Sequence, residues 1–146
     1  MKLTATILAA CLLGLAAEGV QAQGTQKQAP KDNAPQVDFG RYFEEKTMRF
    51  DFYHCGDAAT EEYFFDEVRE EPYWAGSKVS LIDDTGYGVQ LLKVFDKASG
   101  RLIYSRSYCT LFNEWQTTAE AQTVRKAMPE SVVFPYPKGP VRIELH

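Results

Sequence analysis

Hydrophobic and polar residues alternate with a period of two over much of the sequence after residue 37. In the segment 48–54, Met48, Phe50 and Phe52 share one face, and the residues between them share the other. Because successive side chains of a strand point to opposite faces, this alternation predicts a half-buried β-strand. Further strands are predicted at 61–71, 78–83, 131–137 and 140–145.

The segment 61–71 also fits a short helix, but its paired aromatic residues and the proline that follows it favour a strand. Residues 89–96 and 101–108 have the same alternating character and flank the turn sequence Lys97–Gly100. This arrangement predicts a β-hairpin in which Gly100 takes the position that needs a positive φ.

One helix is predicted near the C-terminal end. Thr117 and Glu120 have the spacing of a helix capping box, and Ala121, Val124 and Met128 form a narrow apolar stripe at helical spacing. About seven short strands and one short helix together predict a mainly β fold, a β-sandwich of about seven antiparallel strands.

The first 22 residues have the pattern of a cleaved signal peptide. Lys2 precedes a short apolar run, and small residues precede a cleavage site between Ala22 and Gln23. The apolar run is too short to span a bilayer, so no transmembrane segment is expected. A lipoprotein signal ending at Cys11 is the less favoured alternative. We therefore expect export to a periplasmic, outer-surface or secreted location.

The remaining sequence divides into two parts. Residues 23–37 contain no aromatic residue and only one large aliphatic side chain, which predicts a flexible linker. Residues 38–146 contain all the aromatic residues and are predicted to form the β-sandwich domain. The net charge of −4, without a basic stripe, argues against nucleic acid as a partner.

Cleavage would leave Cys55 and Cys109 as the only cysteines of the chain. In an oxidising compartment the two can form a structural disulfide, and two buried thiols are the alternative. Such a disulfide would close a loop of roughly 55 residues and contribute at most about 4 kcal/mol on the chain-entropy model.

The sequence offers little for catalysis. The only histidines are His54 and His146, and neither belongs to an HExxH motif or to a cluster with zinc-ligand spacing. Acidic residues occur as neighbours in sequence, but neighbours on a strand diverge, which favours a solvated face over a catalytic pair. We therefore predict no catalytic, cofactor-binding or metal-binding residue, and interpret His54 as a hydrogen-bonded histidine at the rim of the core.

Aromatic residues are the remaining candidates for binding. Tyr73, Trp74 and Trp115 could stack on sugar rings or contact a peptide, because aromatic rings offer a large contact area at low entropic cost. For Trp115 we favour packing in the core. For Trp74, which lies at a bend between Pro72 and Gly76, packing at the rim and contact with a neighbouring domain both remain open.

Several distinctive segments resemble the N-terminal, non-catalytic domain of the IgA peptidase family (metallopeptidase family M-sixty-four) of Bacteroides-like bacteria. The similarity extends from about Phe39 to Leu145. The segments occur in the order MRFDFYHCGDA, EEPYWAGSKVSLIDDTGYG, FDKASGRLIYSRSY, FNEWQTTAEA and ESVVFPYPKGPVRIEL.

The resemblance implies a signal peptide, a β-sandwich accessory domain and then a separate catalytic domain with HExxH-type zinc ligands. No such ligand position exists in this sequence, so zinc is expected only in the catalytic domain, and the partner is that domain in cis. The chain is then a fragment, a truncated gene product or a stand-alone copy. Trp74 could dock the peptidase domain, and the alternative is an independent glycan- or peptide-binding module.

Overall fold

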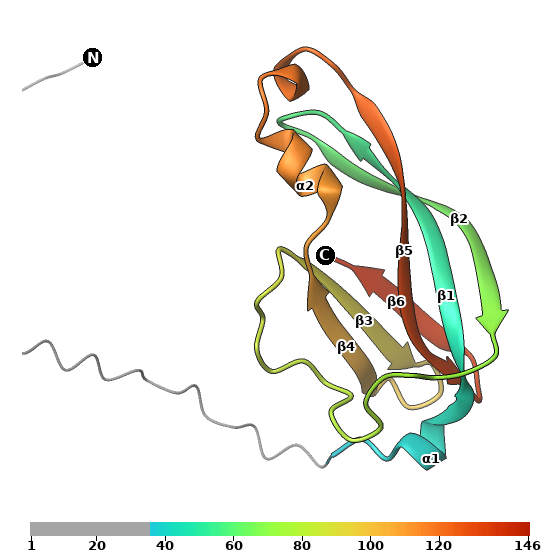
Figure 1. The fold of residues 1–146 in the computed structure, drawn as a ribbon. Helices are drawn as coiled ribbons and strands as arrows, with labels where there is room; N and C mark the ends of the chain where they lie inside the picture. Colours follow the sequence, from blue (N-terminus) through green and yellow to red (C-terminus); the bar gives the residue numbers. More distant parts are fainter. Residues whose placement is uncertain (1–35) are drawn as a thin grey trace, which may run out of the picture. The chain divides into compact units, whose positions relative to one another are not determined.

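Two antiparallel sheets of three strands each form the framework of residues 36–146, the part of the chain that this computed structural model describes (Figure 1). The elements are α1 (Phe39–Tyr42), β1 (Phe43–Gly56), β2 (Glu61–Glu71), β3 (Gln90–Asp96), β4 (Leu102–Tyr108), α2 (Leu111–Gln116), the 3-10 helix η1 (Glu120–Gln122), β5 (Lys126–Pro137) and β6 (Val141–Leu145). The fold is mainly β and is consistent with the predicted β-sandwich.

The predicted signal peptide, its cleavage between Ala22 and Gln23, and residues 23–35 of the linker fall outside the described residues and stay predictions. Val37, at the end of the predicted linker, is buried in the core. Regular packing therefore begins one residue before the predicted domain boundary.

Strand β1 is the centre of the first sheet, which has the order β2-β1-β5. It pairs antiparallel with both neighbours over nearly its whole length. The second sheet has the order β4-β3-β6 and is also antiparallel. The prolines of β5 lie in an edge strand, as their inability to donate a ladder hydrogen bond indicates.

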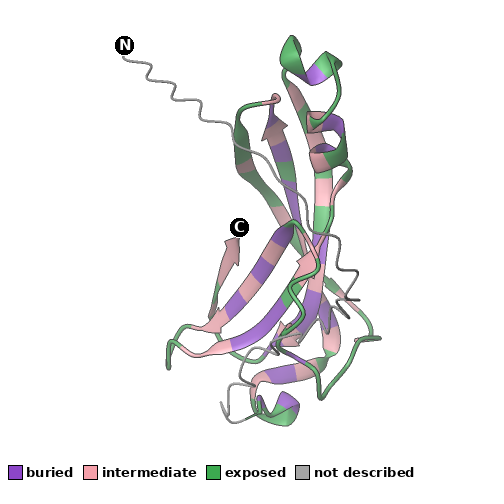
Figure 2. Cartoon of the chain, turned by 90° about the vertical axis from the view of Figure 1, so that its left-hand side faces the viewer, coloured by how far each residue is buried: buried purple, intermediate pink, exposed green. Residues whose placement is uncertain are grey.

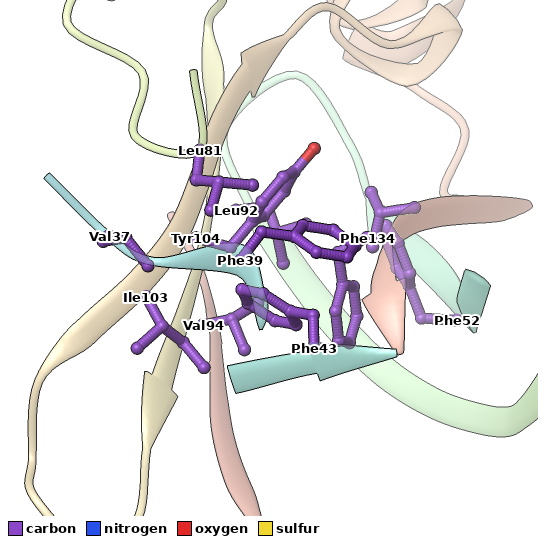
Figure 3. Close-up of a cluster of buried hydrophobic side chains, with 11 residues drawn as sticks. Val37, Phe39, Phe43, Phe52, Leu81, Leu92, Val94, Ile103, Tyr104 and Phe134 are labelled. Atoms are coloured by element: carbon purple, nitrogen blue, oxygen red, sulfur yellow. The ribbon is translucent and has the colours of Figure 1, made fainter. Parts of the chain in front are cut away.

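The main core contains side chains of both sheets, and the alternation of buried and less buried residues is visible along the strands in Figure 2. Tyr104 of β4 and Phe134 of β5 approach across the core with ring centroids 6.3 Å apart. Figure 3 shows the buried side chains of this cluster. The buried members are Val37, Phe39, Phe43, Phe52, Leu81, Leu92, Val94, Ile103, Tyr104, Val132 and Phe134.

A second, smaller cluster covers the end of the first sheet where β1 ends and β2 begins (Figure 1). It is formed by Phe112 and Trp115 of α2 and Ala121 of η1, with Ala58 and Met128 packed against them. The backbone N–H of Ala58 donates to the carbonyl of Ala121 at 3.0 Å, which attaches η1 to the β1–β2 turn.

The predicted hairpin is confirmed. β3 and β4 are antiparallel neighbours, and Gly100 in the turn between them has a φ of 70°, which favours glycine. The backbone N–H of Gly100 donates to the carbonyl of Asp96 at 2.8 Å, and the Asp96 carboxylate accepts from the N–H of Ser99 at 2.8 Å.

The strand predicted at 78–83 is not formed, and the described chain has six strands instead of seven. Leu81 is buried, and its carbonyl accepts from the N–H of Ser105 at 2.9 Å. The next contact, however, joins the N–H of Asp83 to the Ser105 hydroxyl at 2.9 Å. Because a side chain replaces the next backbone partner, the segment follows β4 without extending the sheet.

The helix predicted over 117–128 is also wrong in position. The structure has α2 immediately before this segment, only the short η1 within it, and β5 from Lys126 onward. Met128 pairs with His54 of β1, so sheet pairing determines the conformation of this part. Glu120 forms no capping box, because its carboxylate accepts from Trp115 Nε1 at 2.8 Å instead.

Candidate functional site

The connection 72–89 between β2 and β3 lies along β4 and borders a groove of about 720 Å³. Aromatic side chains contribute part of its lining, and serines and the charged side chains of Asp83 and Arg106 supply polar groups. The aromatic residues are Trp74, Tyr87, Tyr104 and Tyr108. Aromatic walls with a few polar groups are typical of ligand and peptide sites.

Asp83 fixes the connection against β4. Its carboxylate accepts from the N–H of Ser107 at 2.6 Å and also from the Ser107 hydroxyl. It further accepts from the N–H and hydroxyl of Thr85 at 2.8 and 2.6 Å. These hydrogen bonds, led by that of the Ser107 hydroxyl, hold the pKa of Asp83 well below its usual range because they stabilise the charged form.

Asp83→Asn is expected to lower the free energy of unfolding at pH 7 by about 1 kcal/mol, since partly exposed hydrogen bonds to a carboxylate contribute modestly. The folded-state pKa lies below the ordinary value of about 3.9, so this stabilisation is present above pH ~4 and is lost as the pH falls further. Urea unfolding between pH 7 and pH 2 should therefore give a flatter acid dependence for the variant. If the free energy of unfolding depends on pH with the same slope in both proteins, this explanation is wrong.

Trp74 is half-buried and packs within the domain. Its ring meets the Tyr104 ring edge-on, with centroids 6.0 Å apart, and its Nε1 donates to the carbonyl of Ser77 at 3.0 Å. A Cβ atom at Gly76 would lie 2.3 Å from the Trp74 ring, so glycine permits this close approach. The main role of the Pro-Tyr-Trp-Ala-Gly bend is therefore packing within the domain. Trp74 also lines the groove.

Tyr73 differs from its neighbour, because the residue is 82% exposed. Its backbone carbonyl accepts from the Thr47 hydroxyl at 2.5 Å, so its position on the surface is fixed by β1. Tyr87, which the sequence reasoning did not select, is 90% exposed on the same connection. The feature of the sequence that could have indicated the exposure of Tyr87 is its position in the Gly-Tyr-Gly turn.

Trp115 does not belong to this surface. It is only 7% exposed and lies in the second cluster beside Phe112, with ring centroids 5.3 Å apart. The core role favoured for Trp115 is therefore correct, and its use as a ligand surface is not supported.

Cys55 and Cys109 are free thiols in the structure, so the disulfide considered for them is not formed. Cys55 lies in β1 between Glu62 of β2 and Ala127 of β5, whereas Cys109 follows β4 of the other sheet and is exposed beside the groove. The alternative of two buried thiols also fails for Cys109.

His54 is fully buried and contacts two carboxylates. Its Nε2 lies 2.7 Å from Glu61 Oε1, and its Nδ1 lies 3.1 Å from Glu130 Oε2. The ring is stacked between Phe112 and Tyr63, with centroid distances of 3.9 and 4.7 Å. The hydrogen-bonded histidine is as predicted, but it lies inside the protein rather than at the rim.

Glu61 receives further hydrogen bonds at the same oxygen, from the Tyr63 hydroxyl at 3.0 Å and Gln90 Nε2 at 2.7 Å. Burial alone would raise the pKa of Glu61, but the hydrogen bonds from Tyr63, Gln90 and His54 together lower it. Sequence reasoning missed both carboxylate partners, because Glu61 and Glu130 meet His54 only through the pairing of three strands.

The two carboxylates bind opposite nitrogens of the imidazole and so do not converge on one point. Within residues 36–146, no three His, Cys, Asp or Glu side chains are placed to hold a metal ion together. Together with the closed surroundings of His54, this arrangement has the features of a structural polar cluster. The exposed aromatic groove is the better candidate for function.

Fold and groove together describe a mainly β domain with a groove beside β4. Over residues 38–146 the sequence matches the family described as Peptidase M64 N-terminus, and the chain belongs to this family. A search of curated proteins found no match. In the described part of the chain, none of the helices has the length and apolar character needed to cross a membrane.

Proposed function

We propose that this chain acts as the exported, non-catalytic accessory domain that precedes a zinc metallopeptidase catalytic domain. The family match over residues 38–146 carries the proposal, because an N-terminal domain of these peptidases implies a catalytic domain in its relatives. Export rests on the signal-peptide pattern of residues 1–22. Zinc then belongs to the catalytic domain, and its chemistry is assigned to no residue of this chain.

The purified chain supplied with zinc is expected to show no peptide hydrolysis. The physical reason is that His54 is enclosed and its carboxylate partners bind opposite sides of the ring. Cleavage of a denatured protein substrate, with and without a chelator, measures this directly. Turnover that the chelator abolishes would contradict the accessory role.

The connection 72–89 is the surface that we assign to contact with the catalytic domain. Exposed large apolar side chains gathered on one segment are typical of interaction sites. Tyr73 and Tyr87 are exposed on the connection, and Trp74 packs against the Tyr104 ring of β4. The exposed large apolar residues of this segment are Tyr73, Val79, Ile82, Tyr87 and Val89.

Replacing Tyr73 and Tyr87 together by serine should raise the dissociation constant for a separately purified catalytic domain of a family member at least about tenfold. Two aromatic anchors at an interface typically contribute more than 1 kcal/mol each. Isothermal titration calorimetry measures the constant, and circular dichroism checks that the fold is retained.

Leu111→Ser is the matched control, because Leu111 is similarly exposed but lies on α2, outside this segment. It should leave the dissociation constant unchanged. Equal binding by the double variant and the unmodified protein would reject the docking surface, whereas weakening by both variants would place the contact elsewhere.

An independent glycan- or peptide-binding module is the second candidate, and the groove supports it. A volume of about 720 Å³ lies within the range of small-ligand sites, and exposed Tyr87 and the guanidinium of Arg106 are available for stacking and polar contacts. Trp74 lines the groove, so its fluorescence reports occupancy. Saturable binding of oligosaccharides or short peptides, lost in Tyr87→Ser but kept in Leu111→Ser, would favour this function over docking.

A further inference from the structure

Strand β2 (Glu61–Glu71) forms an open edge of the first sheet. Among residues 36–146, β1 is the strand that pairs with β2, and no backbone hydrogen bond is formed on the other side of β2 (Figure 1). An open edge presents a row of N–H and C=O groups to which another extended chain can pair. A role for this edge is independent of the proposed contact through the connection 72–89 and goes beyond the proposed function.

The other edges of the two sheets are blocked or short. β5 contains three prolines, which cannot donate a ladder hydrogen bond. β4 is covered by the connection, where the carbonyl of Leu81 accepts from the N–H of Ser105 at 2.9 Å. β6 has only five residues. β2 has eleven residues and no proline, so it is the longest edge available for pairing in the described part of the chain.

Large apolar side chains lie uncovered along β2. Phe65 is 64% exposed and Val68 is 49% exposed. They pair with Phe52 and Phe50 of β1, and opposite residues of an antiparallel pair share one face of the sheet. The ring centroids of Phe50 and Phe65 are 5.4 Å apart, so apolar packing that begins in the core continues onto β2. A further strand beside β2 would place its own apolar side chains against Phe65 and Val68.

Strand β2 is also strongly acidic. Six of its eleven residues are aspartate or glutamate, and Arg69 is its single basic residue. The pairing with β1 places Glu62, Glu67 and Glu71 on the face opposite to that of the exposed apolar side chains. An added strand would therefore meet apolar groups on one face and carboxylates on the other.

Nearby cations neutralise only part of this charge. Within residues 36–146, three of the four lysine and arginine side chains that contact acids of β2 are shared with an acid outside the strand. The guanidinium of Arg49, for example, lies 2.7 Å from Asp51 Oδ2 and 3.4 Å from Glu71 Oε1. The edge thus keeps a net negative charge. The four cations are Lys46, Arg49, Arg69 and Arg125.

This charge argues against a second copy of the chain as the occupant. If two β2 strands paired antiparallel about Asp66, Glu61 would lie opposite Glu71 and Glu62 opposite Glu70 of the second copy. Like charges directly opposite each other destabilise a strand pair, whereas opposite charges stabilise it. Charge complementarity therefore favours a basic strand.

We propose that the edge of β2 binds an extended, basic segment of another protein, in which lysine or arginine alternates with apolar residues, as an added strand. Main-chain hydrogen bonds provide affinity in this mode of binding, and alternate side chains provide specificity. The apolar side chains of the segment pack beside Phe65 and Val68. Its basic side chains lie on the other face, near Glu62, Glu67 and Glu71.

The test uses the purified chain and a short synthetic peptide that alternates lysine and valine. The peptide should bind in isothermal titration calorimetry, and amide hydrogen exchange should slow within residues 61–71. A peptide with glutamate in place of lysine should bind at least about tenfold more weakly, because its charges repel those of β2. The lysine peptide with every backbone nitrogen methylated keeps its charge but cannot donate, and its affinity should fall by at least about tenfold.

Phe65→Lys adds a positive charge to the edge and removes an apolar contact, so it should raise the dissociation constant of the lysine peptide at least about tenfold. Val68→Lys should act in the same direction and provides a second variant. Val79→Lys makes the same change of charge at a residue that is 66% exposed on the connection, and it should leave the constant unchanged. Circular dichroism checks that each variant is folded.

Four results would overturn the proposal. The first is no binding of the lysine peptide at concentrations up to about 1 mM. The second is equal binding of the methylated peptide, and the third is equal binding by both edge variants and the unmodified chain. The fourth is protection of residues 61–71 that increases with protein concentration in the absence of peptide, which would identify a second copy as the occupant.

Discussion

Replacing Phe134 by alanine should lower the free energy of unfolding by about 3–5 kcal/mol, the usual cost of a cavity left by a buried phenylalanine. Phe134 is fully buried in β5 and contacts Tyr104 of the opposite sheet. Its removal therefore weakens the contact between both sheets. Urea unfolding followed by circular dichroism measures the change.

Phe64→Ala provides the comparison, because Phe64 is the same residue type on β2 but is 52% exposed. This substitution should cost less than about 1 kcal/mol, since little buried surface is lost. If both variants lose the same stability, the interface between the two sheets is not the main stabilising contact.

Replacing His54 by leucine should destabilise the protein by about 3 kcal/mol. Removing the hydrogen-bond partner of a buried carboxylate leaves the carboxylate uncompensated, which usually costs about 3–5 kcal/mol. The Glu130 carboxylate would lose the one hydrogen-bond partner that it has within residues 36–146, whereas Glu61 would keep donors such as Tyr63 and Gln90. The expected value is therefore at the low end of the usual range. Thermal unfolding at pH 7 measures it.

A second substitution checks the cause. Glu130→Leu in the His54→Leu background should recover part of the lost stability, because it removes the uncompensated carboxylate. If the stability losses of His54→Leu and Glu130→Leu simply add in the double variant, His54 contributes by packing against Phe112 and Tyr63 and not through its carboxylate partners.

The strand pattern of this domain could be predicted from sequence because burial follows the period of two. Segment 61–71 and the hairpin around Gly100 form as expected. Segment 117–128 was misassigned because its helical spacing is real but weak. Pairing of β5 with β1 provides more hydrogen bonds and burial than a short exposed helix would. Local propensity does not reveal such competition between distant partners.

The candidate site was predicted only in part. The sequence directs attention to Tyr73 and Trp74, since an aromatic pair between proline and glycine is unusual in a plain core strand. It does not distinguish the packed Trp74 from the exposed Tyr73, because both occur in the same bend. The partners of His54 could not be predicted from the sequence, because the register between strands brings them together and sequence spacing does not.

The position of β1 in the middle of the first sheet affects how the chain folds. Gly56 pairs with Lys126 and Phe43 with Pro137, so this central strand gains one of its two neighbours only after residues 126–137 are available. Contacts between residues so far apart in sequence slow folding, because a long loop must close before they form. We expect the emerging chain to remain unfolded until β5 has been synthesised, because β1 lacks one of its two sheet neighbours before then.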